Sequence, residues 1–261
     1  MFDLTHHSSW DEFFTDEIIE ILSSIYLKLS NGFDFEDYCL KEGVVPQSLK
    51  IYPCKSDVLR FIRTNLNNVK CVIVGMDPYP SWNSKYGLPQ ATGRAFEVSE
   101  LDGKGWDYPI KQASLRNILR SLYYNKTGNA KSITEIRQEI LLGSFSISNP
   151  CDWFDKTEEQ GVLWLNSTLT VEAGNPGSHE AIWEPFRKRL FPFLADRDIP
   201  FMLWGNNAVK EVGSIIPMAN AVLSDKAPVV TKIQLIAPHP RVEAFIKNNT
   251  FKSNVNVNWY C

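Results

Sequence analysis

The sequence predicts an α/β fold with a central four-stranded, mostly parallel sheet flanked by helices on both faces. Four short apolar runs have the length of buried strands, the first of them is rich in β-branched residues, and they alternate with longer segments of helical periodicity. The chain of 261 residues is 44% hydrophobic, which is ample for one large core. We therefore expect a single domain over residues 1–261.

The helical segments carry apolar residues at helical spacing along one face. Ser9 is placed to cap the first of them, and Ser132 and Glu135 have the spacing of a capping box in the fourth. The expected helices cover residues 9–30, 55–66, 113–124, 132–143, 179–195 and 206–216. The expected strands cover residues 70–74, 162–165, 200–204 and 233–236.

Charge and cysteine usage restrict the functional classes. A net charge of −3 argues mildly against a nucleic-acid binder, although a local basic patch can override the global balance. The five cysteines form no C-x-x-C pair, so we expect reduced thiols, no iron–sulfur cluster and no cysteine-rich zinc site. We see no signal peptide and no membrane span, and we expect a cytoplasmic protein, or a nuclear one in a eukaryote.

Polar residues follow each of the four expected strands. Asp77 and Tyr79 follow the first strand, Asn166 ends the second, Asn206 follows the third and His239 follows the fourth. The carboxyl ends of parallel strands lie along one edge of a sheet, where ligands bind in open α/β folds. The sequence therefore favours an active site or a tight binding site at this edge.

Each of these side chains has a functional and a structural interpretation. Asp77 suits a general base or a charge that stabilises a cationic transition state, but it also suits an Asx-turn. His239 suits donation to an oxygen that gains negative charge, or a loop hydrogen bond. The Asn166 carboxamide suits hydrogen bonding to the edge of a base, or capping of a turn. Phe96 is by itself more typical of a core residue than of a stacking platform.

Five stretches, in this order and spacing, resemble the ung-type branch of the uracil-DNA glycosylase family. They are Gly75–Tyr79, Gly93–Phe96, Gly161–Val171, Leu203–Gly205 and His239–Pro240, and the resemblance extends over roughly residues 50 to 255.

The resemblance implies that the protein flips uracil out of DNA into a fitted pocket without a metal or organic cofactor. Phe96 would then stack on the ring, Asn166 would pair with uracil N3–H and O4, and Tyr79 would exclude the thymine methyl group. Asp77 would orient water and stabilise the cationic sugar, and His239 would donate to uracil O2 as the base leaves as an anion.

Several positions depart from the family pattern. Met76 stands where Gln is usual, which leaves only backbone contacts with the pocket, and Pro80 stands where His is usual, which removes a donor. The proline-rich loop before Ser114 is replaced by residues 110–113, and Asn206 stands where Ser is usual. Ser114 and Asn206 remain the expected contacts with DNA phosphates.

The largest departure follows His239-Pro240, where the common Ser-Pro-Leu-Ser is absent. Arg241 is expected to contact phosphate instead, and Glu243 would face DNA unfavourably. The residue that wedges into the duplex is Val242, Phe245 or none.

We therefore expect a uracil-DNA glycosylase of base-excision repair, with weaker handling of duplex DNA and a preference for single strands. Two alternatives remain: a DNA- or partner-binding module that keeps the glycosylase body, and a glycosylase for another damaged base. The expected partners are uracil-containing DNA and a DNA-mimic inhibitor protein, with no membrane, and the expected state is a monomer.

Overall fold

A computed structural model describes residues 2, 4, 8–30, 51–216, 229–230, 234–254 and 256–261. Its contacts divide the chain into two compact units of interleaved segments. The first unit comprises Met1–Asn68, Gly75–Glu100 and Trp164–Arg197, and the second comprises Val69–Val74, Leu101–Leu163 and Asp198–Cys261. The single domain expected from the sequence stays a prediction.

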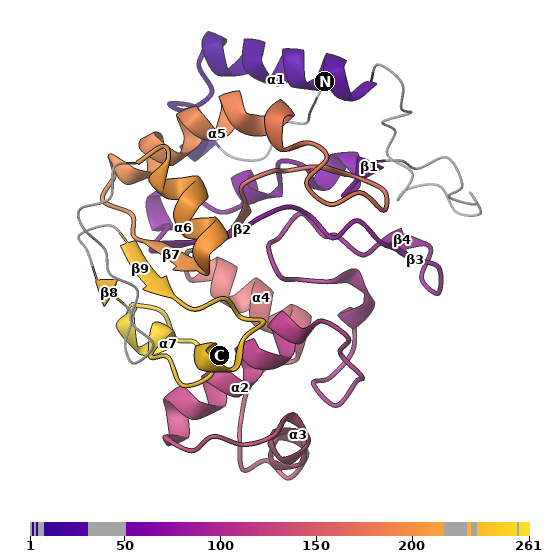
Figure 1. Ribbon diagram of the computed structural model, residues 1–261, viewed down its shortest axis with the longest axis vertical. Coiled ribbons are helices and arrows are strands. Elements are labelled where there is room, and N and C mark those ends of the chain that lie inside the picture. The colour runs from indigo at the N-terminus through magenta and orange to yellow at the C-terminus, as the bar shows by residue number, and fades with distance from the viewer. Residues whose placement is uncertain are drawn as a thin grey trace. The chain divides into compact units, whose positions relative to one another are not determined.

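The main sheet contains the four predicted strands. Its order is β5 (Val162–Asn166), β2 (Cys71–Gly75), β7 (Phe201–Trp204), β9 (Gln234–Ala237) and β8 (Val229–Val230). The pairs β2–β7 and β7–β9 are parallel, and Figure 1 shows β7 and β9 side by side. The predicted strand over residues 233–236 begins one residue outside the described part of the chain.

Two backbone hydrogen bonds at the ends of β5 and β2 show that these strands are also parallel. Lys70 donates to the Gly161 carbonyl at one end, and Ser167 donates to the Gly75 carbonyl at the other. β8 pairs antiparallel with β9 and was not predicted. The fold class is therefore confirmed, with one short antiparallel strand added.

Most of the predicted helices are present. These are α2 (Ala113–Thr127), α3 (Ile133–Leu141), α5 (Glu180–Ala195) and α6 (Asn206–Gly213). The first helix, α1 (Asp16–Ser30), begins later than expected and lies along α5 (Figure 1). Ser9 does not cap it, because its hydroxyl accepts the backbone N–H of Leu66 and residues Ser8–Trp10 form a separate 3₁₀ turn.

The predicted helix over residues 55–66 is wrong. This segment forms the 3₁₀ turns Lys55–Asp57 and Arg60–Arg63, followed by a third turn over Leu66–Asn68. The apolar face that suggested a helix is buried as expected, but the Arg63 guanidinium donates a hydrogen bond to the carbonyl of Ser56. A carbonyl held by a side chain favours short turns here over a continuous helical ladder.

Several short elements were not predicted. They are α4 (Pro150–Glu159), α7 (Thr250–Ser253), the 3₁₀ turns Ser99–Leu101 and Glu243–Phe245, and the antiparallel pairs β1 (Ile51–Tyr52) with β6 (Val171–Glu172) and β3 (Trp82–Asn83) with β4 (Leu88–Pro89). Only α4 had a clear signal, because Pro150 occupies its first turn, where proline is well tolerated.

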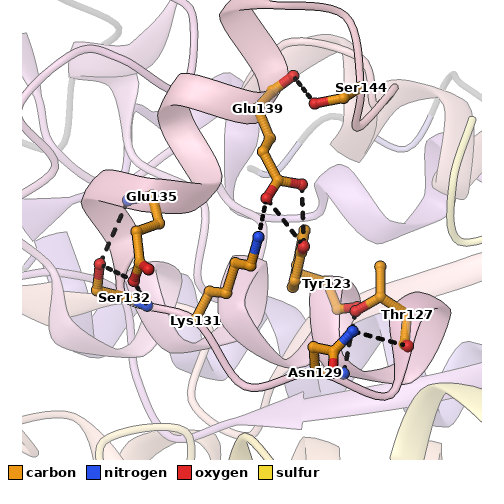
Figure 2. Close-up of polar contacts among 8 residues, drawn as sticks. All are labelled: Tyr123, Thr127, Asn129, Lys131, Ser132, Glu135, Glu139 and Ser144. Atoms are coloured by element: carbon orange, nitrogen blue, oxygen red, sulfur yellow. Dashed lines mark hydrogen bonds and ion pairs between the residues drawn. The ribbon is translucent and has the colours of Figure 1, made fainter.

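The connection from α2 to α3 is fixed by polar contacts around Glu139 (Figure 2). The Glu139 carboxylate accepts the Tyr123 hydroxyl and pairs with Lys131. Ser132 caps α3, with its hydroxyl accepting the Glu135 N–H and the Glu135 carboxylate accepting the Ser132 N–H, so the predicted capping box is confirmed. These contacts, partly buried around Glu139 and exposed at Ser132, account for the local fold.

The expectation of reduced cysteines is wrong for Cys54, which is disulfide-bonded. Cys71, Cys151 and Cys261 are free thiols, and burial raises the pKa of Cys71 to about 12. A cysteine count does not show which side chains approach each other, and so the sequence did not distinguish Cys54 from the others.

None of the described helices is long and apolar enough to cross a membrane. Within the described residues, no three His, Cys, Asp or Glu side chains gather as potential metal ligands.

Candidate functional site

In the first unit, Asn166 at the end of β5 lies directly against Gly75 at the end of β2. A Cβ atom on Gly75 would clash with Asn166 Oδ1 and would lie 2.9 Å from the Ala95 Cβ. Glycine is therefore required at this position for the carboxamide to sit there. Asn166 is only 5% exposed, and no hydrogen bond among the described residues involves its carboxamide.

The Asp77 carboxylate is held by a backbone group of a neighbouring turn. Its Oδ2 accepts the N–H of Gly177 at 2.7 Å, and three residues further on the Pro80 carbonyl accepts the N–H of Gly174. Among the described residues, no hydrogen bond is made by Oδ1. One oxygen of the carboxylate is thus anchored, and the other is available to a ligand or a water.

Tyr79 lies against a small apolar cluster. It is partly buried and packs on the buried residues Tyr52, Ala91 and Val171. A ring held by packing has little freedom to move aside, and so Tyr79 is suited to act as a fixed wall.

Met76 is held by its backbone. Its carbonyl accepts the Thr168 N–H and the Ser167 hydroxyl, while its side chain is 47% exposed. Its backbone, rather than its side chain, therefore ties this turn to the end of β5.

Phe96 has a left-handed backbone conformation, with φ +67°. This conformation costs a non-glycine residue about 1–2 kcal/mol. The preceding Ala95 donates its N–H to the Trp164 carbonyl of β5, which places Phe96 one residue from the contact between Gly75 and Asn166. The sequence contained no sign of this strain.

His179 belongs to a buried chain of hydrogen bonds. The indole N–H of Trp183 donates to Thr170 Oγ1, and the Thr170 hydroxyl lies 2.9 Å from His179 Nδ1. Thr170 Oγ1 therefore links the indole of Trp183 to the imidazole of His179. Burial lowers the pKa of His179, which favours the neutral ring.

In the second unit, His239 follows β9 and rests against Gly205. A Cβ on Gly205 would lie 2.6 Å from the His239 Cβ, and Gly205 has φ +96°, so glycine is required on both grounds. The backbone N–H of Arg241 donates to His239 Nδ1 at 3.0 Å. Nδ1 is therefore unprotonated, and the neutral ring carries its proton on Nε2, which makes no hydrogen bond to the described residues. Burial and the charge of Arg241 both lower the pKa of His239.

The segment after His239 is held by side chains of α2. Asn117 donates to the Pro240 carbonyl, and Arg120 makes two hydrogen bonds, of 2.8 and 2.9 Å, to the Glu243 carboxylate. Phe245 is fully buried, and so its ring has no access to a ligand. Val242 is 48% exposed and is the large apolar side chain that this segment presents.

The expected DNA contacts of the second unit differ in exposure. Arg241 and Asn206 are exposed, and Asn206 is the first residue of α6. Ser114 lies in the first turn of α2 and is only 5% exposed.

The predicted site residues are thus divided between the two units. Met76, Asp77, Tyr79, Phe96 and Asn166 belong to the first, and Ser114, Asn206, His239, Arg241 and Val242 belong to the second. Two residues that support the site were not predicted from the sequence: Gly177, which anchors Asp77, and Arg120, which pairs with Glu243. Neither had a sequence signal, because their partners lie 100 and 123 residues away.

Comparison with known proteins identifies relatives named uracil-DNA glycosylase, although no family model matches the chain. The uracil-DNA glycosylase of Francisella philomiragia is 31% identical over 221 residues, which are 82% of this chain and 85% of that protein. The uracil-DNA glycosylase of Saccharomyces cerevisiae is 32% identical over 214 residues. These are 77% of this chain but 51% of the yeast protein, so the chain spans about half the length of that relative.

Solved structures support the same fold. The wild-type glycosylase of Nitratifractor salsuginis covers 96% of this chain with a TM-score of 0.64 at 18% identity, and 90% of that structure is matched. A variant of the mimivirus enzyme, solved in complex with UGI, covers 90% of this chain with a TM-score of 0.57 at 24% identity, and 70% of it is matched. The identity to the Francisella protein over most of both chains, together with this fold, shows that the chain belongs to the uracil-DNA glycosylase family, whose named members hydrolyse N-glycosyl bonds.

Proposed function

We propose that this protein flips uracil out of DNA and hydrolyses its N-glycosidic bond. Residues at the ends of β2 and β5 and directly after them contact the base and the sugar. Family membership supports uracil excision in DNA repair. The observation that carries the proposal is the arrangement at Gly75, where a buried carboxamide and an anchored carboxylate follow adjacent strands. This arrangement provides an amide edge for a base and a fixed charge for a sugar.

Base recognition is assigned to three side chains of the first unit. The Asn166 carboxamide pairs with N3–H and O4 of uracil, because it offers both an acceptor and a donor and makes no hydrogen bond within the described structure. The Phe96 ring stacks on the base. The packed Tyr79 ring fills the space beside C5, where thymine carries a methyl group.

The chemical step is assigned to one anion and one neutral donor. The free oxygen of Asp77 orients the attacking water and stabilises the positive charge that develops on the sugar as the bond breaks. The Nε2–H of neutral His239 donates to uracil O2, which gains negative charge as the base leaves. A neutral imidazole is suited to this role because its N–H is a very weak acid, so it hydrogen-bonds to the leaving anion without transferring its proton to it.

We also propose that the protein handles single strands better than duplexes. Val242 is the large exposed apolar residue of the segment that holds a leucine wedge in the common family pattern, and it is shorter than leucine. Pairing with Arg120 offsets the charge of Glu243. Arg241 and Asn206 are exposed and available to phosphates. They can therefore bind the sugar–phosphate backbone of DNA without sequence preference.

A DNA-mimic inhibitor protein is the second proposed partner. The related mimivirus variant was solved in complex with UGI, and this chain shares its fold. An acidic inhibitor would meet Arg241 and Val242 in place of DNA. The monomeric state and the cellular location stay predictions.

The proposal is tested by incubating the protein with single- and double-stranded oligonucleotides that contain uracil, thymine or cytosine, followed by alkaline cleavage of abasic sites. We expect cleavage at uracil alone, and we expect Tyr79→Ala to admit thymine. Tyr108→Ala, at a partly buried tyrosine of the second unit, serves as the matched control and should keep discrimination. No cleavage on any strand would favour the binding-module alternative, and cleavage at another base would favour a different glycosylase.

A further inference from the structure

Phe96 is one of two non-glycine residues with positive φ in the described part of the chain. The other, Asp198 with φ +55°, lies in an exposed turn. An unfavourable backbone conformation persists only where the surroundings fix it, and such positions gather at ligand sites. The contacts around Phe96 therefore indicate what holds it.

A buried ion pair spans Phe96. Arg94 Nη1 lies 3.0 Å from Glu97 Oε1, and both side chains are only 6% exposed. The second carboxylate oxygen of Glu97 accepts the hydroxyl of Thr92 at 2.6 Å. The charged groups on either side of Phe96 are therefore tied to each other and to the start of the same turn.

The ends of this turn are fixed by other parts of the first unit. The Thr92 carbonyl accepts from Arg60, and the Ala95 N–H donates to the Trp164 carbonyl. Gly93, with φ +86°, lies so close to the Asp57 carbonyl that a Cβ would clash with it. The turn between Thr92 and Glu97 is consequently held from three sides.

We infer that the Arg94–Glu97 ion pair is a positioning device that holds Phe96 in its left-handed conformation and so presents the ring to a flipped base. A buried ion pair contributes little net stability compared with apolar residues of similar volume, so its value here is conformational. Arg94 and Glu97 are positioning residues, because they act through Phe96. This inference rests on the proposed function and adds to it the origin of the stacking geometry.

The test replaces both charges, because removal of only one would leave a buried charge unpaired. The variant Arg94→Met/Glu97→Leu keeps the volume of the pair. We expect it to fold, with a melting temperature near that of the wild type. We expect inhibition by free uracil, and kcat/KM on a single-stranded uracil oligonucleotide, to weaken about tenfold, as in Phe96→Ala.

A thermodynamic cycle separates positioning from general damage. Adding Phe96→Ala to the double replacement should weaken uracil inhibition no further, because the ring has already lost its orientation. Glu184→Gln/Lys188→Gln, which removes an exposed ion pair of α5, is the matched control and should leave uracil inhibition unchanged.

The outcomes are distinct. Wild-type uracil affinity in a folded double variant, with weak affinity in Phe96→Ala, would overturn the positioning role alone. A wild-type protein that neither excises uracil nor is inhibited by it would overturn the proposed function and this inference with it. If the double variant does not fold, Thr92→Val removes one hydrogen bond to Glu97 at constant volume; weaker uracil inhibition supports the inference, and unchanged inhibition contradicts it.

Discussion

Individual side chains of the site owe their orientation to backbone N–H groups. The Gly177 N–H selects one oxygen of Asp77, and the Arg241 N–H selects one nitrogen of His239. The sequence placed both residues after strands, but it did not reveal which atom each would use. That choice depends on backbone groups brought near by the fold, one of which lies far away in the sequence.

The state of His239 predicts a pH dependence. Its pKa is lowered from the ordinary 6.5, so neutral His239 and the kcat that depends on it should persist to pH below 6.5 and fall only as the pH drops further. The unfolded chain binds the proton more readily than the folded one in this window, so the stability contributed by neutral His239 also falls as the pH drops below 6.5.

Arg241→Gln removes one of the two causes of this lowered pKa. The acid limb of the rate profile should therefore move to higher pH, measured as kcat against pH on a single-stranded substrate. Lys252→Gln removes an exposed charge elsewhere and should leave the limb in place. A limb that moves equally in both variants would show that His239 is not the titrating group.

At the scale of elements, each of two strand ends carries a glycine that makes room for a functional side chain. Gly75 ends β2 beside Asn166, and Gly205 follows β7 beside His239. The resemblance named these glycines as parts of motifs, and the structure gives the physical reason for each. Packing of a later strand end against an earlier one cannot be deduced from local patterns.

Gly205→Ala should therefore strain the backbone and lower the rate of catalysis. The substitution costs about 1 kcal/mol in strain and also displaces His239, so kcat should fall by about 10²-fold. Gly103→Ala meets a similar positive φ, but nothing lies within 4 Å of its Cβ, so it should lower the melting temperature and leave kcat unchanged. Equal kcat in both variants would contradict the proposed contact.

The ion pair between Arg120 of α2 and Glu243 predicts that loss of one partner and loss of the other change KM for DNA in opposite directions. Arg120→Ala leaves Glu243 uncompensated and should raise KM for DNA, whereas Glu243→Ala should lower it or leave it unchanged. Because Glu243 is 70% exposed, the free energy of unfolding should change by less than about 1 kcal/mol. The double variant should resemble Glu243→Ala, and a KM raised equally by both single substitutions would refute the pairing argument.

For the whole molecule, hydrophobic patterning was sufficient to predict the parallel strands and most helices. The departures have local causes: a side chain occupies a carbonyl in the segment 55–66, and Ser9 bonds to Leu66 instead of capping α1. The site residues were predicted from strand ends and the resemblance. The strain at Phe96 and the ion pair beside it were not, because burial and φ are properties of the fold.

Strand preference is a property of the whole molecule, and Val242 tests it. Val242→Leu lengthens the exposed apolar side chain and should raise kcat/KM on duplex uracil several-fold, while leaving the single-stranded value unchanged. Val242→Ala should lower the duplex value only. Duplex uracil excised far faster than single-stranded uracil by the unmodified protein would refute the preference itself.

The central claim, that a carboxylate anchored at the end of β2 drives uracil excision, is tested most directly by single-turnover excision from a single-stranded uracil oligonucleotide by the wild type and Asp77→Asn. Asp102→Asn, at an exposed carboxylate of the second unit, is the control. We predict release of uracil by the wild type and by Asp102→Asn, and a rate lower by about 10²-fold or more in Asp77→Asn with similar DNA binding. Equal rates for wild type and Asp77→Asn, or no release by the wild type, would contradict the account.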